Sequence, residues 1–308
     1  MSAWMRSLVL VGIASTALHA ETYYLTVAGL GGEAEYEQRF AGWASDLDKL
    51  LTKEPGAKVE TLSGLQATKE NIAAKMKAIA GSAKATDNFI LLMMGHGSYD
   101  LEYKFNIPGP DLGAAELKEM LDKIPAQQLI VNMTSASGGM IEVLQKPKRV
   151  LVTATKAGSE KNATVFARYF IEALRDAGAD SDKNEAISAL EAFRYAEQKT
   201  SKFFEAQKRL ATEHAVLEDT GKGEGVKNPT TENGQGIAAN RFYVLHLGAV
   251  ASFINNPEKQ KLLKQKEELE ASIDDLKYRK ASLPSAEYRT QLQKFLLELA
   301  KVQEGLDK

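Results

Sequence analysis

The chain has no cysteine among its 308 residues, which excludes disulfide bonds, thiolate metal sites and a thiol nucleophile together. It has no excess of positive charge either, because 39 Lys and Arg stand against 41 Asp and Glu and the formal net charge is −2. Nucleic acid is therefore not an expected partner, since nothing would neutralise the phosphates. The two tryptophans add no platform for stacking bases. The 44% hydrophobic and 26% charged residues predict a folded, soluble protein with a sizeable core.

Long apolar runs are also missing, except near the N-terminus. Arg6 is followed by an apolar segment, Leu8–Leu18, and then by small residues. This order is typical of a secretory signal, and the segment is too short to span a membrane. We expect residues 1–20 to be a signal peptide, cleaved after Ala20 or after Ala17, and the mature protein to be periplasmic or secreted. The alternative is an N-terminus that is disordered or that anchors the protein.

Short apolar, β-rich runs recur along the chain, and amphipathic helical patterns separate the early ones. Because the runs are continuous rather than alternating, both faces of each strand should be covered, as in a parallel sheet. The pattern predicts a three-layer α/β/α sandwich with a mostly parallel six-stranded sheet. The expected strands are Thr22–Gly29, Lys58–Leu62, Asn88–Gly95, Gln128–Thr134, Arg149–Thr155 and Arg241–Leu247. The expected helices are about Tyr36–Thr52, Thr68–Ala80, Ala114–Lys123, Asn162–Asp176 and Lys183–Ala211.

The segment Ala215–Ala239 is rich in Gly, Asn and Thr, and it predicts a long surface loop. Its acidic residues Glu218, Asp219 and Glu224 could attract a cation. Their spacing is not that of a calcium loop, however, so a solvated loop is the favoured interpretation.

The last fifty residues, Lys259–Lys308, are highly charged and carry leucines in heptads. Pro284 interrupts the pattern, so we expect two helices in an antiparallel hairpin with Ser285 as an N-cap. Such a hairpin either packs on itself as a stalk or serves as an arm for self-association or partner docking. The predicted domains are therefore residues 21–256 and residues 257–308.

Two predicted strand ends carry reactive side chains. His96 follows the third strand between Gly95 and Gly97, where the backbone can bend sharply and expose the imidazole. Ser135 follows the fourth strand. Because adjacent parallel strands end at one crevice, we expect both side chains there, and an imidazole beside a hydroxyl is the minimum for nucleophilic acyl transfer. The other three histidines are His19 in the predicted signal, His214 at a helix end and His246 inside an apolar strand.

The sequences "ILLMMGHGS" and, after a strand-length gap, "IVNMTSASGGM" are similar to the legumain-type branch of the caspase-like cysteine peptidases. In that family a His-Gly pair ends strand three, and a Cys followed by x-Ser-Gly ends strand four. The segments "LTVAGLGG" and "VLVTATKAGSEKNATVFARYFIEAL" are similar to the first and fifth strands of the same fold. The resemblance covers roughly Tyr23 to Phe253 and places the histidine before the nucleophile, opposite to the α/β-hydrolases.

The resemblance implies a caspase-like fold that hydrolyses peptide bonds in a peptide or protein substrate, with no cofactor and no metal. It implies that His96 matches the general base and that Ser135 stands in the place of the nucleophilic cysteine. The backbone amides of Gly97 and Ser135 would then form the oxyanion pocket. Gly31 stands where legumain has a third catalytic residue, an Asn, so support for the imidazole is expected to be missing. The legumain substrate preference is not carried over, because "GEAEYEQ" lacks the basic residues of the legumain pocket.

The exchange of cysteine for serine leaves three interpretations open. A serine hydroxyl needs a well-placed base, and serine hydrolases usually orient that base with a carboxylate. Asp100 and Glu102 follow His96, but no pattern shows either of them reaching the imidazole. Ser135 is a working nucleophile, or it marks an inactive relative whose crevice binds a peptide or protein, or it merely ends a strand.

A dinucleotide site is the rival from another class. Gly29-x-Gly31-x-x-Ala34 follows strand one and matches the dinucleotide fingerprint, with Glu60 near the end of strand two as a ribose ligand. The loop also carries Glu33 and Glu35, however, whose charges would oppose a pyrophosphate, and an exported protein rarely meets a soluble nicotinamide. The alternative is an ordinary tight turn from strand to helix.

Overall fold

The computed structural model describes residues 20–54, 56–230, 233–248 and 256–308. The predicted signal peptide, except for Ala20, lies outside the described residues. Within the described ranges, no helix combines the length and apolar character needed to cross a bilayer.

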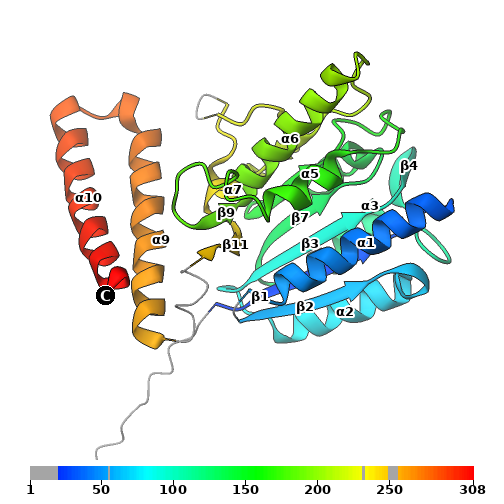
Figure 1. The fold of residues 1–308 in the computed structure, drawn as a ribbon, viewed down its shortest axis with the longest axis horizontal. Coiled ribbons are helices and arrows are strands. Elements are labelled where there is room, and N and C mark those ends of the chain that lie inside the picture. Colours follow the sequence, from blue (N-terminus) through cyan, green and yellow to red (C-terminus); the bar gives the residue numbers. More distant parts are fainter. Residues whose placement is uncertain (1–19, 55, 231–232, 249–255) are drawn as a thin grey trace, which may run out of the picture.

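A six-stranded sheet forms the centre of the molecule (Figure 1). Its order is β10-β8-β7-β3-β1-β2, and all neighbouring strands run parallel except β10, which is antiparallel to β8. The first five predicted strands are all present in this sheet. The strands are β1 (Thr22–Ala28), β2 (Ala57–Leu62), β3 (Asn88–Met94), β7 (Gln127–Asn132), β8 (Arg149–Thr153) and β10 (Val216–Glu218).

The sixth strand differs from the predicted one. The expected strand Arg241–Leu247 contains β11 (Tyr243–His246), but β11 pairs with β9 (Ala186–Ser188) in a separate two-stranded sheet. The main sheet instead ends with β10, inside the segment predicted to be a loop, and α7 (Ile237–Arg241) lies at the end of that segment. Three buried residues are too short a run for hydrophobic periodicity to reveal a strand, and periodicity does not say which sheet a strand joins.

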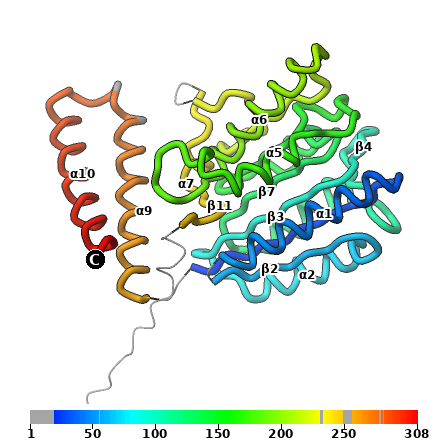
Figure 2. Tube along the Cα trace, viewed as in Figure 1, coloured from blue at the N-terminus to red at the C-terminus, as the bar shows by residue number. Residues whose placement is uncertain are grey.

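Helices cover both faces of the sheet (Figures 1 and 2), which confirms the three-layer α/β/α sandwich. Successive strand residues point to opposite faces, so Tyr24 packs in one core with α1, α5 and α6, while Leu25 packs in the other with α2, α3 and α4. The helices are α1 (Ala34–Leu51), α2 (Lys69–Ser82), α3 (Ala114–Leu121), α4 (Ile141–Leu144), α5 (Phe166–Ala173) and α6 (Ala189–Ala206).

Polar side chains define several helix starts. The hydroxyl of Thr68 accepts from the amide of Asn71 at the start of α2. Ser188 and Glu191 form a reciprocal capping box at the start of α6. The prediction that this helix begins at Lys183 is therefore wrong, because the residues before Ser188 form β9 and a turn-rich loop.

The C-terminal segment forms the expected antiparallel helical hairpin of α9 (Pro257–Tyr278) and α10 (Ser285–Asp307), which lies beside the sandwich (Figure 1). Ser285 is the first helical residue of α10 rather than its N-cap, because Pro284 occupies the cap position. The two helices approach closely at Gly305, where an added Cβ would lie 2.9 Å from Leu262.

Candidate functional site

The candidate site lies where β3 and β7 end, at the carboxyl edge of the sheet. The chain turns after β3 at Gly95, whose φ of +140° favours glycine, and then enters a small antiparallel sheet. The strands of this small sheet are β4 (Gly97–Asp100), β5 (Glu102–Phe105) and β6 (Leu112–Gly113). His96 therefore stands at the junction between the main sheet and the small one.

The imidazole of His96 is held in one orientation. Its Nε2 lies 3.1 Å from the backbone carbonyl of Gly31. A carbonyl oxygen only accepts, so this bond places the proton on Nε2 and leaves Nδ1 of the neutral ring with a free lone pair. The ring packs edge-on against Tyr36 and Phe40 of α1, with centroid separations of 4.8 and 5.3 Å. A half-buried imidazole fixed in this tautomer is suited to act as a base.

The expectation that Gly31 leaves the imidazole without support needs a correction. The support comes from the main chain of Gly31 and not from a side chain. A glycine is required at this place, because a Cβ would lie 2.3 Å from the backbone nitrogen of Glu37.

Ser135 is buried against the residue that follows His96. Its hydroxyl donates to the carbonyl of Gly97 over 2.9 Å and accepts from the amide of the same residue over 3.0 Å. Only 2% of the Ser135 surface is exposed. Glycine permits this closeness, because a Cβ on Gly97 would lie 2.4 Å from the carbonyl oxygen of Ser135. The two strand ends thus meet, but in the described part of the chain the Ser135 hydroxyl bonds only Gly97 and not the His96 ring.

The backbone directly after Ser135 is strained. Ala136 has a φ of +56°, a left-handed conformation that costs a residue with a Cβ about 1–2 kcal/mol. It is fully buried, and its amide donates to the carbonyl of Glu160 over 2.7 Å. Strain of this kind is retained where the surroundings hold a side chain in a required position. Here the loop after β8 holds the turn that presents Ser135.

The two carboxylates considered as partners of His96 lie elsewhere. Asp100 and Glu102 face each other at the tip of the β4–β5 hairpin, on either side of Leu101, which is 94% exposed. Among the described residues, the only polar partner of the His96 ring is the carbonyl of Gly31. The site therefore offers a base without a carboxylate behind it.

The glycine loop after β1 does not present free amides to a pyrophosphate. The side chain of Glu37 accepts from the amides of Gly31 and Gly32, over 2.8 and 3.4 Å. Glu60, the expected ribose ligand, pairs with Lys75 of α2. A dinucleotide would have to displace a carboxylate from the amides that it needs, which disfavours the rival interpretation.

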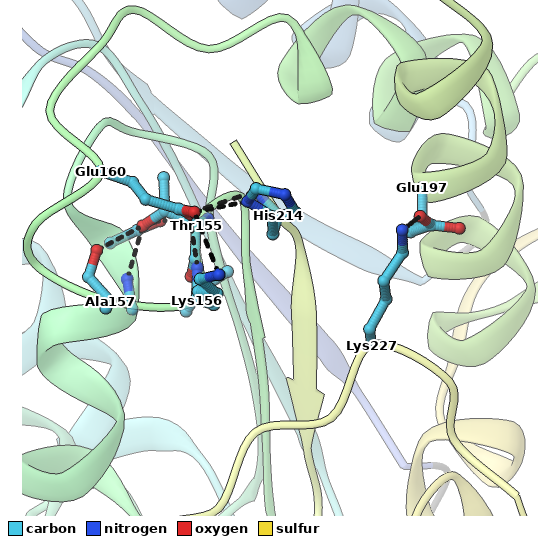
Figure 3. Close-up of polar contacts among 10 residues, drawn as sticks. Thr155, Lys156, Ala157, Glu160, Glu197, His214 and Lys227 are labelled. Carbon is cyan, nitrogen blue, oxygen red and sulfur yellow. Dashed lines mark hydrogen bonds and ion pairs between the residues drawn. The ribbon is translucent and has the colours of Figure 1, made fainter. Parts of the chain in front are cut away.

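A cavity of about 250 Å³ opens beside the loop that follows β8. Glu160 joins this cavity to the Ser135 turn: its carbonyl accepts from Ala136, while its carboxylate bonds the amide and the imidazole of His214 (Figure 3). Figure 3 also shows the ion pair between Lys227 and Glu197 of α6, both of which line the cavity. Two hydrogen bonds, from His214 to Glu160 and from Glu160 to Ala136, thus connect the wall of the cavity to the residue that follows the candidate nucleophile.

Two further polar groups line the cavity. Burial raises the pKa of the Glu213 carboxyl to about 7, although the amides of Val165 and Phe166 donate to it. The hydroxyl of Thr200 is buried and has no hydrogen-bond partner among the described residues. An unpartnered polar group is costly in a protein interior.

The residues around the side chains of His96 and Ser135 were not predicted from the sequence. Tyr36 and Phe40 have the helical spacing of ordinary core aromatics. Asn132 is fully buried, and its side-chain oxygen accepts from the amide and the hydroxyl of Thr134, over 3.1 and 2.8 Å. The available signal was an amide side chain inside an otherwise apolar strand, since buried polar groups require partners.

Metal ligands are scarce near His96 and Ser135. Across the described ranges, one group of three acidic residues is close enough to share a cation, namely Asp180, Asp182 and Glu191. It lies before and within the start of α6, near β9, and not at the strand ends that carry the candidate site.

The chain is similar to known proteins in sequence and in fold. The family model described as the peptidase C13 family matches residues 56–216, more than half of the chain, including His96 and Ser135. No curated protein sequence matches the chain significantly.

Three solved structures are similar to the chain, all with low sequence identity. Caspase-1 from Spodoptera frugiperda has a TM-score of 0.47 and 14% identity, over 65% of this chain and 87% of that one. The Drosophila initiator caspase Dronc has a TM-score of 0.43 and 13% identity, over 67% and 81%. A protein of Geobacter sulfurreducens has a TM-score of 0.42 and 12% identity, over 58% and 88%.

Proposed function

The chain belongs to the peptidase C13 family, and on this premise we propose that it hydrolyses peptide bonds with Ser135 as nucleophile and His96 as general base. The observation that carries the proposal is the contact of 3.1 Å between Nε2 of His96 and the carbonyl oxygen of Gly31. Because Nε2 donates to Gly31, Nδ1 is the atom available to take a proton.

The reaction follows from these groups. Nδ1 of His96 takes the hydroxyl proton while the Ser135 oxygen bonds to the carbonyl carbon of a peptide substrate. The amides of Gly97 and Ser135 stabilise the oxyanion, and His96 then gives its proton to the leaving amine as the C–N bond breaks. Water hydrolyses the resulting acyl ester, again with His96 as base, and the serine is restored.

The hydrogen bonds between the Ser135 hydroxyl and the backbone of Gly97 must break before Ser135 can react. The Ser135 hydroxyl is bonded to both backbone groups of Gly97, and the Gly97 amide is one of the two proposed oxyanion donors. A bound substrate would therefore have to turn the hydroxyl toward Nδ1 of His96 and release the amide. We infer that the cavity joined through Glu160 receives a substrate side chain and favours this change.

Labelling with a fluorophosphonate tests the proposal, because this probe forms a covalent bond only with an activated hydroxyl. We expect the parent protein to be labelled and to cleave peptide esters, and the Ser135→Ala and His96→Ala variants to do neither. Ser159→Ala changes an exposed serine of the neighbouring loop and serves as the control that keeps both activities. A parent that is neither labelled nor active contradicts a serine enzyme.

A second candidate function is peptide or protein binding by an inactive relative. It is favoured by the two bonds that engage Ser135 with Gly97, and by the lack of a carboxylate partner for His96 among the described residues. Its signature is an unlabelled parent that nevertheless retains peptides from a random library. Loss of that retention in a Tyr99→Ala variant would place the peptide in this crevice, since the Tyr99 ring covers Gly139 and Gly158.

We also propose that the protein is exported. The pattern of residues 1–20 supports this, and the mass of the protein recovered from the periplasm or medium tests it. The expected mass lacks the first 17 or 20 residues, depending on the cleavage position. An exported protein that keeps the whole segment would contradict a cleaved signal.

We propose, finally, that the hairpin mediates self-association. Leu296 and Leu297 of α10 are 48% and 57% exposed, which is a high exposure for two adjacent leucines. Light scattering is expected to show an oligomer that Leu297→Glu disrupts, while Gln293→Glu, a new charge at an exposed polar position of the same helix, leaves it intact. A monomeric parent contradicts this role.

A further inference from the structure

The segment between α5 and α6 carries a calcium-loop sequence that the proposed hydrolase does not use. Its twelve residues, Asp180 to Glu191, read "DSDKNEAISALE". In calcium loops of the helix–loop–helix type, oxygen ligands stand at positions 1, 3, 5, 9 and 12, and position 7 contributes its backbone carbonyl. Position 6 is a glycine in that pattern; here it is Glu185, which adopts the same left-handed backbone with a φ of +65°. This chain has an oxygen-bearing side chain at each of the five positions: Asp180, Asp182, Asn184, Ser188 and Glu191.

The ligand set is therefore more than a group of acids. It includes an amide and a hydroxyl, and the apolar residue at position 8 is the fully buried Ile187. Ile187 lies in β9, which pairs with β11, and α6 starts at position 10 of the loop. The structure thus agrees with the sequence register on where the exiting helix starts, whereas α5 ends at Ala173, before the loop.

The three carboxylates are gathered in space. One oxygen from each of Asp180, Asp182 and Glu191 lies within 4.8 Å of the others. Oxygen atoms that surround one cation at 2.3–2.6 Å are separated by distances of this order. The arrangement needs little movement to enclose an ion.

The charge of this group is not balanced within the described residues. Asp180 and Glu191 are only 5% and 4% exposed, yet no Lys, Arg or His forms an ion pair with any of the three carboxylates. The two lysines at the loop, Lys183 and Lys266, instead donate to the backbone carbonyls of Asp180 and Asn184. Backbone amides of the loop donate to the two buried carboxylates, Asp180 and Glu191, but supply no positive charge. A buried charge without a counterion is costly, so this pair favours a bound cation.

We propose that Asp180–Glu191 is a calcium-binding loop. The all-oxygen ligand set suits a hard cation and lacks the imidazole and thiolate ligands that select zinc. Six or more oxygen positions on a flexible loop suit Ca²⁺ better than Mg²⁺, which demands compact octahedral geometry and retains its water.

The position of the loop suggests what calcium would do. The loop lies near β11 and α9, on the side of the sandwich away from β4 (Figure 1). Lys266 of α9 donates a hydrogen bond to the carbonyl of Asn184 in the loop, and the negative charge of Asp182 repels that of Glu270 on the same helix. Calcium neutralises this negative side and so strengthens the docking of the hairpin, independently of the hydrolase site.

Thermal unfolding of the purified full chain in chelator-treated buffer tests the proposal. We expect CaCl₂ to raise the Tm and to give a saturable isotherm by calorimetry, and MgCl₂ at equal concentration to give a smaller shift. Asp182→Asn removes a ligand that is exposed and caps no helix, so this variant should fold and bind calcium at least about 10-fold more weakly. Glu191→Gln should lose the response as well.

Glu185→Gln is the matched control, because it removes one charge from position 6 of the same loop, which supplies no ligand. It should keep the parent's calcium response. The proposal is overturned if the parent does not respond to calcium, if Mg²⁺ is as effective as Ca²⁺, or if Asp182→Asn responds like Glu185→Gln.

Discussion

The His96 imidazole donates from Nε2 to the carbonyl oxygen of Gly31 over 3.1 Å, across 65 positions of the chain. This bond joins the loop after β1 to the turn after β3 and leaves Nδ1 as the basic atom. The main chain thus orients the imidazole, a task that a carboxylate or an amide side chain performs in serine and cysteine hydrolases.

Replacing Gly31 should disturb this bond. In Gly31→Ala the new Cβ would meet the Glu37 nitrogen at 2.3 Å, so the loop must shift, at a cost of about 1–3 kcal/mol in the free energy of unfolding. We expect a mixed tautomer of His96 in ¹⁵N NMR spectra, where the parent shows a proton on Nε2 alone.

Gly32→Ala is the control for that experiment. Gly32 has a φ of +75° but open space around it, so its replacement adds backbone strain of about 1 kcal/mol and no collision. It should keep the parent's tautomer. An unchanged tautomer in Gly31→Ala would show that the carbonyl does not orient the ring.

Ser135→Cys should convert the site to the chemistry of the family. A thiol is partly ionised near neutral pH and needs less help from the base than a hydroxyl does. We expect peptide cleavage that exceeds that of the parent by about 10-fold or more, and rapid alkylation by iodoacetamide. Since the chain has no other cysteine, the alkylation reports on this position alone.

Ser137→Cys provides the comparison, because Ser137 is a buried hydroxyl two residues away that bonds Thr155 rather than Gly97. It should be alkylated slowly and should cleave nothing. Equal alkylation of the two variants would mean that His96 does not activate the group at position 135.

Ser135 should also contribute to stability. Ser135→Ala leaves both the amide and the carbonyl of Gly97 without their partner in a buried place, which costs about 1–3 kcal/mol in the free energy of unfolding. Urea denaturation measures the change, and the exposed Ser159→Ala should alter it by less than about 0.5 kcal/mol. A Ser135→Ala variant that is more stable than the parent would show that the two bonds are strained.

Stability should fall in alkaline solution because of His246. Burial lowers the pKa of its imidazole, but the bonds with Glu267 and Glu54 outweigh burial and raise the pKa from 6.5 to about 10. Since the folded pKa exceeds the unfolded one, the stabilisation is complete below pH 6.5 and is lost as the pH rises toward 10. The free energy of unfolding should therefore decrease by at most about 1.4 kcal/mol per pH unit.

Denaturation at several pH values between about 8.5 and 10 tests this dependence. This range lies above the one in which Glu213 and Glu270 titrate, since burial raises the pKa of both carboxyls to about 7. His246→Gln should flatten the slope. The same slope in both proteins would rule out His246 as its source.

The proposed calcium loop shows why the start of α6 was predicted wrongly from the sequence. Its ligand spacing was present in the sequence, but Lys183–Ala211 has an amphipathic pattern from which one long helix was predicted. The helix starts only at Ala189, because Ser188 and Glu191 cap it there. Helical periodicity obscured a loop motif that overlaps the first turn of the helix, where position 12 is also the capping residue.

The sequence by itself determined the layered sandwich, the five parallel strands, the helical hairpin and the placing of His96 and Ser135 at strand ends, because hydrophobic periodicity and glycine turns act over a few residues. Only the tertiary structure decided that β10 and not β11 completes the sheet, since strand pairing depends on partners far away in the chain. It alone supplied the Gly31 carbonyl to His96 and both backbone groups of Gly97 to Ser135. Every residue except proline carries the same main-chain donor and acceptor, so the residue type does not predict which of these groups a distant side chain will contact.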